Sequence, residues 1–114
     1  MPHCILELTD TVPQKTEMMR AALVALDTSG LFATDDIKVR MLEYPSDSIY
    51  HAVTPVFVHV TIYLLSGRTD DQKHQLSADV YQAVLPYVEA CRPCSVSVNL
   101  IDMDRGSYVK KLVV

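Results

Sequence analysis

The sequence lacks a continuous apolar segment of the about 20 residues that a membrane-spanning helix requires. It also lacks a tract of Lys and Arg residues, and 10 basic against 14 acidic side chains leave a net charge of −4. Because a basic patch is the usual footprint of binding to polyanions, neither nucleic acid nor an anionic membrane is an expected partner. The first residues lack the basic, apolar and small-residue regions of a signal peptide, so we expect a cytoplasmic protein.

Cysteine is scarce: the chain has three, an odd number that fits free thiols in a reducing compartment. Two of them form the C-x-x-C pattern of Cys91 and Cys94. In redox proteins the first cysteine of this pattern begins a helix, where the dipole lowers the thiol pKa; here the pair follows a predicted helix, whose end would raise it. A zinc site needs about four ligands, and the histidines are not paired at ligand spacing. We expect no metal and no cofactor, and interpret the two cysteines as loop residues.

Apolar residues, in contrast, make up 49% of the 114-residue chain. A chain of this length is expected to form a single domain, residues 1–114, and a domain of this size covers only part of its own apolar surface. The C-terminal stretch 107–114 adds Val109, Leu112, Val113 and Val114, which would be costly to expose to water. This excess indicates an oligomer in which the tail packs on a neighbouring chain.

Apolar periodicity predicts four strands, at residues 2–8, 37–44, 55–65 and 95–103. The segment 55–65 is apolar on both faces, which is typical of a central strand, and its His59 is interpreted as a core residue. The strands and the two helices between them make two β-α-β units, in which right-handed crossovers leave the flanking strands parallel. We predict an α+β fold, with a mixed sheet, both helices on one face and a second copy covering the other.

Local signals place the ends of the two predicted helices. The first would begin at Thr11 as N-cap, with Pro13 in its first turn and Gln14 at the capping-box position, and would end near residue 27. The second would begin at Thr69, with Gln72 completing a capping box. Pro86 is expected to kink or shorten this second helix, because proline cannot donate the helical hydrogen bond.

Three cationic side chains are candidate ligands for an anion. Lys38 and Arg40 share one face of a predicted strand, roughly 7 Å apart at about 3.3 Å of rise per residue. Arg68 immediately precedes the second helix, whose first N–H groups already favour anions. Arginine pairs with carboxylates through two parallel hydrogen bonds. The three residues therefore suggest a site for a carboxylate, if the sheet brings them together.

The chain begins Met1-Pro2, and this pair is a candidate catalytic group. If Met1 is removed, Pro2 becomes a free secondary amine at the start of a strand. An α-amino group has a reference pKa near ~8, and burial disfavours its charged form, so such an amine can transfer protons near neutral pH. If Met1 is retained, the Pro2 nitrogen is a tertiary amide without basicity.

These motifs together resemble the 5-carboxymethyl-2-hydroxymuconate isomerases of the tautomerase superfamily. The likeness covers almost the whole chain and rests on Met1-Pro2-His3 with Glu7, on 37–40, on 57–61, and on 66–69 before a long helix. It implies a homotrimer of β-α-β units, Pro2 as the catalytic base, and Lys38, Arg40 and Arg68 as substrate-binding residues. Lysine at position 38 departs from the arginine common there in the family, and it supplies a point charge rather than a planar fork.

The resemblance implies an isomerase without a cofactor, of the kind used in aromatic-compound catabolism. It would move a proton within a small unsaturated 2-hydroxy or 2-oxo carboxylic acid such as 5-carboxymethyl-2-hydroxymuconate. Nearby cations and N–H donors would stabilise the dienolate formed on the way. The alternative is a non-catalytic or promiscuous oligomeric protein that binds small molecules on the same scaffold.

Overall fold

A computed structural model describes residues 1–114 as four strands and two α-helices. The strands are β1 (His3–Thr9), β2 (Lys38–Tyr44), β3 (Phe57–Leu65) and β4 (Ser95–Met103). The helices are α1 (Lys15–Thr28) and α2 (Asp70–Val84), and short 3₁₀ helices lie at Thr34–Asp36, Ser46–Ser48 and Leu85–Cys91. Each predicted strand and helix is therefore confirmed.

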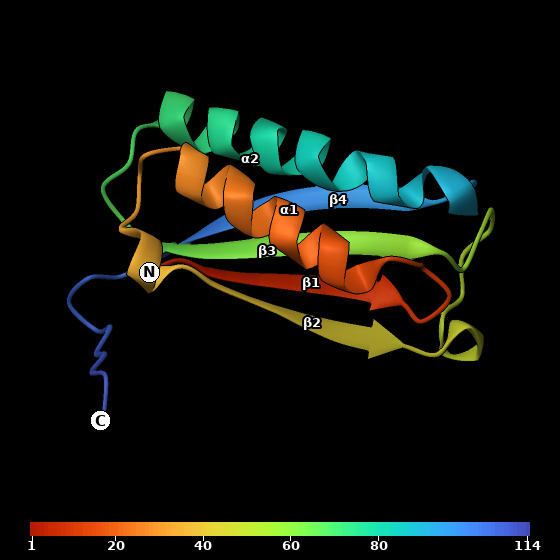
Figure 1. Ribbon diagram of the computed structural model, residues 1–114, viewed down its shortest axis with the longest axis horizontal. Helices are drawn as coiled ribbons and strands as arrows, with labels where there is room; N and C mark the ends of the chain where they lie inside the picture. The colour runs from red at the N-terminus through yellow and green to blue at the C-terminus, as the bar shows by residue number, and fades with distance from the viewer.

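The four strands form one mixed sheet in the order β2-β1-β3-β4. β1 is parallel to β2 and β3 is parallel to β4, while the two central strands, β1 and β3, are antiparallel to each other. Figure 1 shows both helices on the same side of this sheet. Each helix connects the two parallel strands of its β-α-β unit. The predicted α+β architecture with two β-α-β units is confirmed.

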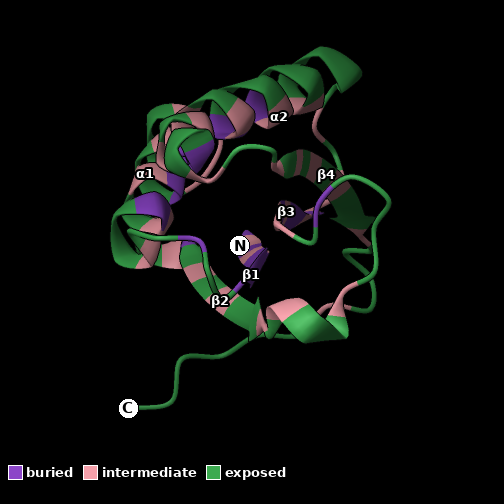
Figure 2. Ribbon diagram, turned by 90° about the vertical axis from the view of Figure 1, so that its right-hand side faces the viewer, coloured by how far each residue is buried: buried purple, intermediate pink, exposed green.

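The core lies between the sheet and the two helices. In Figure 2 the buried residues follow the inner surfaces of the helices and the two central strands. They include alternate residues of β1 and β3 and the inward stripes of α1 and α2: Cys4, Leu6, Leu8, Met18, Ala22, Leu26, Val58, Val60, Ile62, Leu64, Leu76, Val80 and Val84. Neither helix is both long and apolar enough to cross a membrane.

The antiparallel pairing of β1 with β3 decides which loops meet. His3 at the start of β1 lies opposite Tyr63 near the end of β3, and also opposite Lys38 at the start of β2. Met103, the last residue of β4, lies opposite Leu65. The N-terminus, the β3–α2 turn and the segment after β4 therefore gather at one end of the sheet, which we call the amino end.

The opposite side of the sheet carries no helix. This helix-free face is made by the other set of alternating residues, including Ile5, Glu7, Lys38, Arg40, Leu42, Tyr44, Phe57, His59, Thr61, Tyr63, Asn99 and Ile101. The interpretation of His59 as a core residue is wrong, because it lies on this face, where its Nδ1 is 2.6 Å from the Ser97 hydroxyl. Within one chain, the central strand β3 is covered on one side.

The start of α1 differs from the prediction. Thr11 does not cap the helix, which begins at Lys15, and Gln14 precedes it in a left-handed conformation with φ 57° and without a side-chain cap. The chain first makes a turn in which the Val12 N–H donates to the Thr9 carbonyl at 3.1 Å. Because Val12 is 1% exposed, burying this side chain sets the turn and overrides the local capping pattern.

The predictions for α2 are confirmed. The Thr69 hydroxyl accepts a hydrogen bond from the Gln72 N–H, and the Gln72 side chain accepts one from the Thr69 N–H. The α-helix ends at Val84, two residues before Pro86, and the chain continues as a 3₁₀ helix over Leu85–Cys91. Proline has no N–H to extend the α-helical pattern, so it shortens the helix at this point.

The C-terminal segment leaves the body of the protein after a turn at residues 104–107 (Figure 1). Its apolar side chains are exposed: Val109, Leu112, Val113 and Val114 all keep more than three quarters of their surface accessible, between 78% and 111%. Exposing such a cluster to water is unfavourable. Packing of this tail on a neighbouring chain stays a prediction.

Candidate active site

Pro2 lies at the amino end of the sheet, immediately before β1 and beside the start of β2. Its residue is buried, and its carbonyl accepts the Lys38 N–H at 3.2 Å, which extends the parallel pairing of the two strands by one residue. The Met1 side chain is 2% exposed, and its amine lies 3.6 Å from the Asp36 carboxylate. In this form of the chain the Pro2 nitrogen is an amide, and the basic group at the amino end is the Met1 amine.

The surroundings of this amine are charged. The Lys110 ammonium pairs with the Asp36 carboxylate at 2.7 Å, and the Lys38 ammonium donates to the Asp36 carbonyl at 3.3 Å. Burial lowers the pKa of the Met1 amine, and the charges of Lys110 and Lys38 lower it further, against the opposing effect of Asp36. The hydrogen bond from Lys110, followed by the charge of the amine, lowers the pKa of the Asp36 carboxyl. Burial and the two lysines therefore outweigh Asp36 in setting the pKa of this amine.

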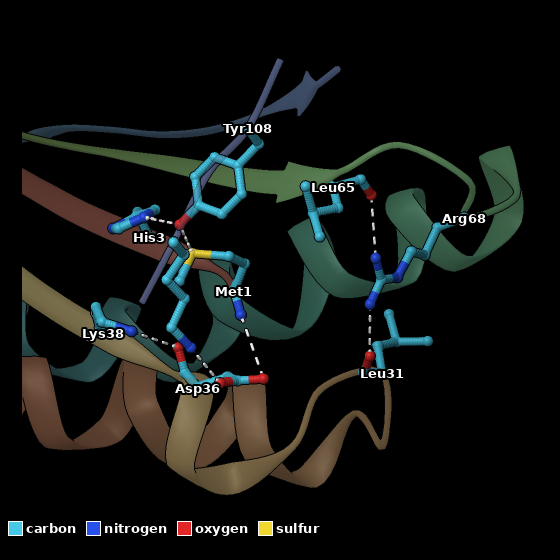
Figure 3. Close-up of polar contacts among 9 residues, drawn as sticks. Met1, His3, Leu31, Asp36, Lys38, Leu65, Arg68 and Tyr108 are labelled. Atoms are coloured by element: carbon cyan, nitrogen blue, oxygen red, sulfur yellow. Dashed lines mark hydrogen bonds and ion pairs between the residues drawn. The ribbon is translucent and has the colours of Figure 1, made fainter. Parts of the chain in front are cut away.

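A chain of three polar side chains runs along the helix-free face toward Met1. The Arg40 guanidinium lies 3.1 Å from Nδ1 of His3, and Nε2 of His3 lies 3.0 Å from the Tyr108 hydroxyl. The Tyr108 hydroxyl in turn donates to the Met1 sulfur. Figure 3 shows Tyr108 and His3 on one side of Met1 and Asp36 on the other. Burial, and then the charges of Arg40 and Lys38, lower the pKa of His3 and favour its neutral form.

Arg68 lies to one side of this group, at the β3–α2 turn (Figure 3). Its guanidinium donates to the Leu65 carbonyl at 3.0 Å and to the Leu31 carbonyl at 2.7 Å, and it lies 5.1 Å from the centre of the Phe32 ring. Arginine has five N–H donors, so others remain for a ligand. In the chain by itself Arg68 ties the α1–β2 connection to the end of β3.

The structure thus brings some of the predicted site residues together more closely than others. Pro2 and Lys38 are direct neighbours, and Arg40 reaches the amino end through His3. Arg68 occupies the same end but makes its contacts with backbone carbonyls. The roles of all four as base or substrate ligands stay predictions.

Three further residues at this end were missed by the sequence analysis: Asp36, Tyr108 and Lys110. The segment 107–114 was interpreted as an apolar tail, and Lys110 was not singled out within it. Tyr108 and Lys110 are two residues apart, the spacing that places side chains on one side of an extended chain. Both of them turn toward the amino end, while Val109 between them is exposed.

The two cysteines of the C-x-x-C pattern lie elsewhere. Cys91 ends a 3₁₀ helix and Cys94 immediately precedes β4, whose first residue pairs with Phe57 at the end of the sheet opposite to Pro2. Burial, with a smaller effect from Cys91, raises the pKa of the Cys94 thiol to about 11. A thiol with this pKa is a poor nucleophile at neutral pH.

No protein-family model matches the chain, and no curated protein matches its sequence. Its structure, however, is similar to several solved ones. A 5-carboxymethyl-2-hydroxymuconate isomerase from Deinococcus radiodurans R1 matches with a TM-score of 0.82 and 20% identity, over 96% of this chain and 88% of that one. A symmetric trimer of wild-type fused 4-OT matches with a TM-score of 0.76 and 20% identity, over 90% of this chain and 86% of that one.

A malonate semialdehyde decarboxylase inhibited by 3-bromopropiolate matches with a TM-score of 0.74 and 14% identity, over 96% of this chain and 88% of that one. These likenesses extend over nearly the whole of each chain, so they concern the complete arrangement of sheet and helices. At this level of sequence identity they establish the fold. The chain has the tautomerase fold that its motifs led us to expect.

Proposed function

We propose that the protein, once Met1 is removed, is an isomerase that moves a proton within a small unsaturated 2-hydroxy or 2-oxo carboxylic acid, with the Pro2 amine as base. The observation that carries the proposal is the setting of the N-terminus. Met1 and Pro2 are buried at the start of β1, the pKa of the Met1 amine is lowered, and Lys38 and Lys110 lie nearby through their contacts with Asp36. A base with a lowered pKa next to cations suits the removal of a proton to leave an anion.

The proposed reaction needs no cofactor. The lone pair of the Pro2 nitrogen takes a proton from a carbon next to the substrate's carbonyl, and the electrons of the broken C–H bond form a dienolate. The protonated amine then returns the proton to another carbon of the conjugated system, so no atom is gained or lost. Lysine ammonium groups near the amine would stabilise the dienolate and hold a carboxylate.

The substrate class rests on the site and on the similar proteins. Ammonium and guanidinium groups at the amino end favour an acid, and a proton-transfer base favours a conjugated one. One similar structure is that of a 5-carboxymethyl-2-hydroxymuconate isomerase, and another was inactivated by 2-oxo-3-pentynoate. We propose Lys38 as a direct carboxylate ligand, and Arg40 and Arg68 as cations that support binding. Arg68 would use the N–H groups that do not donate to the Leu65 and Leu31 carbonyls.

The proposal includes a homotrimer. Each chain exposes apolar surface on the helix-free face and along its tail. On the helix-free face, Leu42 is 53% exposed and Ile101 39% exposed. A fused 4-OT of the same fold forms a symmetric trimer. In such an assembly a second copy would cover the helix-free face.

One observation favours the alternative, a binding protein without catalysis. Met1 is held in place by the protein: its side chain is buried, its amine faces Asp36 and its sulfur contacts Tyr108. A protein that keeps Met1 in this position has no prolyl amine, because the nitrogen has given its lone pair to the amide. Retention of Met1 in the mature chain would make the binding protein the better assignment.

The test compares two forms of the full chain, one beginning at Pro2 and one beginning at Met1, each confirmed by intact mass. Ultraviolet absorbance would follow the ketonisation of a small unsaturated 2-hydroxy acid. General acid–base catalysis typically contributes ~10²–10⁴-fold, so the form beginning at Pro2 should be at least about a hundredfold faster. Equal rates for the two forms would exclude Pro2 as the base and leave the binding protein.

A further inference from the structure

The side chain of Met1 marks the space that the proposed function would leave for a substrate. Met1 is joined directly to the Pro2 nitrogen, and its side chain is buried against the protein. When Met1 is removed, that nitrogen becomes an amine that faces the vacated space. Whatever polar group touched the Met1 side chain then faces the same space.

That polar group is the Tyr108 hydroxyl, which donates to the Met1 sulfur. A thioether is a weak acceptor, so this donor is only poorly satisfied by methionine. Figure 3 shows the Tyr108 hydroxyl on the side of Met1 opposite to Asp36, between His3 and the sulfur. A small acid placed beside the Pro2 nitrogen would meet this hydroxyl on one side and the Asp36–Lys110 pair on the other.

The direction of the Tyr108 donor is set by its neighbours. A guanidinium has only donors, so the Arg40 nitrogen at 3.1 Å requires Nδ1 of His3 to be the acceptor. A neutral His3 then carries its proton on Nε2 and donates it to the Tyr108 oxygen at 3.0 Å. With its oxygen accepting from His3, Tyr108 directs its own O–H away from His3, toward the space that Met1 fills. The lowered pKa of His3 agrees with the neutral ring that this arrangement needs.

We propose that Tyr108 is a further catalytic residue, whose hydroxyl donates a hydrogen bond to the oxygen of the substrate's dienolate, and that His3 and Arg40 are positioning residues that orient it. The role rests on the proposed function, since it needs Met1 removed and an oxyanion formed next to Pro2. An aimed donor of this kind acts where negative charge develops, so its contribution falls mainly on the transition state.

The experiment uses the chain beginning at Pro2 and the variant Tyr108→Phe, which keeps the ring and removes the hydroxyl. Loss of one such donor costs about a hundredfold or more in kcat, and KM should stay within a few-fold of the parent value, because the bond strengthens in the transition state. Tyr50→Phe is the matched control. Tyr50 is fully exposed in the loop after β2, at the other end of the sheet, and its variant should keep the parent rate.

The positioning role has its own readout in ¹⁵N chemical shifts of the histidine rings. His3 should be neutral with its proton on Nε2. Arg40→Met should lower kcat and remove this tautomer preference. Arg40→Gln, which keeps an N–H donor, should restore most of the kcat and most of the tautomer preference. A His3 proton on Nδ1 in the parent protein would overturn the arrangement. An active parent with an unaffected Tyr108→Phe variant would overturn the role of Tyr108 alone, whereas an inactive parent beginning at Pro2 would overturn the proposed function and this role with it.

Discussion

The Nε2 atom of His3 lies 3.0 Å from the hydroxyl oxygen of Tyr108, and this contact joins the first strand to the segment that follows the last. An ion pair of 2.7 Å between Lys110 and Asp36 joins the same segment to the 3₁₀ helix that precedes β2. The residues beyond Lys110 have no such contacts and are exposed. The C-terminal segment therefore has two parts, one that borders the candidate site and one whose apolar side chains are exposed.

Arg68 is expected to contribute to stability as well as to any ligand. The variant Arg68→Ala loses hydrogen bonds to the Leu65 and Leu31 carbonyls and the contact with the Phe32 ring. Hydrogen bonds to charged groups contribute ~1.5–3 kcal/mol, so urea denaturation should show a free energy of unfolding lower by roughly 2 kcal/mol. The control Arg92→Ala breaks an exposed surface pair with Glu89, so the free energy of unfolding should stay close to the parent value.

The same variant should also weaken carboxylate binding, by up to about tenfold in KM, if Arg68 uses its remaining N–H groups on the substrate. An Arg68→Ala protein with unchanged stability and a raised KM would show that the carbonyl contacts matter little. Unchanged stability together with unchanged KM would remove Arg68 from both roles.

The protein is expected to be a trimer at micromolar concentration, by light scattering. Leu42→Asp places a charge on the helix-free face, where the proposed interface would bury it, and should yield monomers because an unpaired buried charge is strongly unfavourable. Val24→Asp makes the same change on the outer surface of α1, where Val24 is 54% exposed, and should leave the trimer intact. A parent protein that scatters as a monomer would contradict the prediction.

Removing both thiols of the C-x-x-C pattern should leave isomerase activity within a few-fold of the parent value. Cys91 and Cys94 lie at the end of the sheet away from Pro2, and burial raises the pKa of Cys94 to about 11. The double variant Cys91→Ser, Cys94→Ser is assayed beside the parent, with circular dichroism as the check on folding. A loss on the order of a hundredfold in a folded variant would assign these cysteines a function.

The elements of the fold could be predicted because their patterns are local. The apolar run at 55–65 and the capping box at Thr69 each depend on a few neighbouring residues, and the strand β3 and the capping box are both confirmed. The start of α1 was wrong because burial of Val12, a tertiary effect, won over a local capping signal. Propensity is a weak guide wherever packing competes with it.

The candidate site could be predicted only in part, for a related reason. Pro2 and Lys38 lie on strand starts, and parallel strands linked by a helix bring such ends together. Tyr108 follows the last strand in an irregular segment, and nothing near it in the sequence indicates that it reaches His3. Likewise, the contact of Arg68 with Leu31 depends on where the α1–β2 connection lies, which no local pattern specifies.

The pH dependence of the processed protein gives the most direct check on the base. Catalysis should rise with pH through the pKa of the Pro2 amine, because only the unprotonated amine has a lone pair to take a proton. Asp36, Lys38, Lys110 and His3 face the N-terminus. Burial lowers the pKa of the Met1 amine, the negative charge of Asp36 raises it, and the positive charges of Lys110 and Lys38 lower it. We expect the same charges to act in the same directions on the Pro2 amine once Met1 is removed.

Mutations can separate the opposing effects of the lysines and of Asp36 on the amine pKa. Lys110→Met removes a positive charge, so the amine pKa should rise and the rate on the acidic side of the profile should fall a few-fold. Asp36→Asn removes the opposing negative charge, so the pKa should fall and the rate on that side should rise. On the alkaline plateau the amine is unprotonated in every variant, so a fall in kcat that remains there for Lys110→Met measures its other proposed role, the stabilisation of the dienolate. Lys15→Met is the control, because Lys15 pairs with Glu43 near the far end of β2 and should leave the profile in place. Shifts in the same direction for Lys110→Met and Asp36→Asn would mean that the titrating group is not the amine beside them.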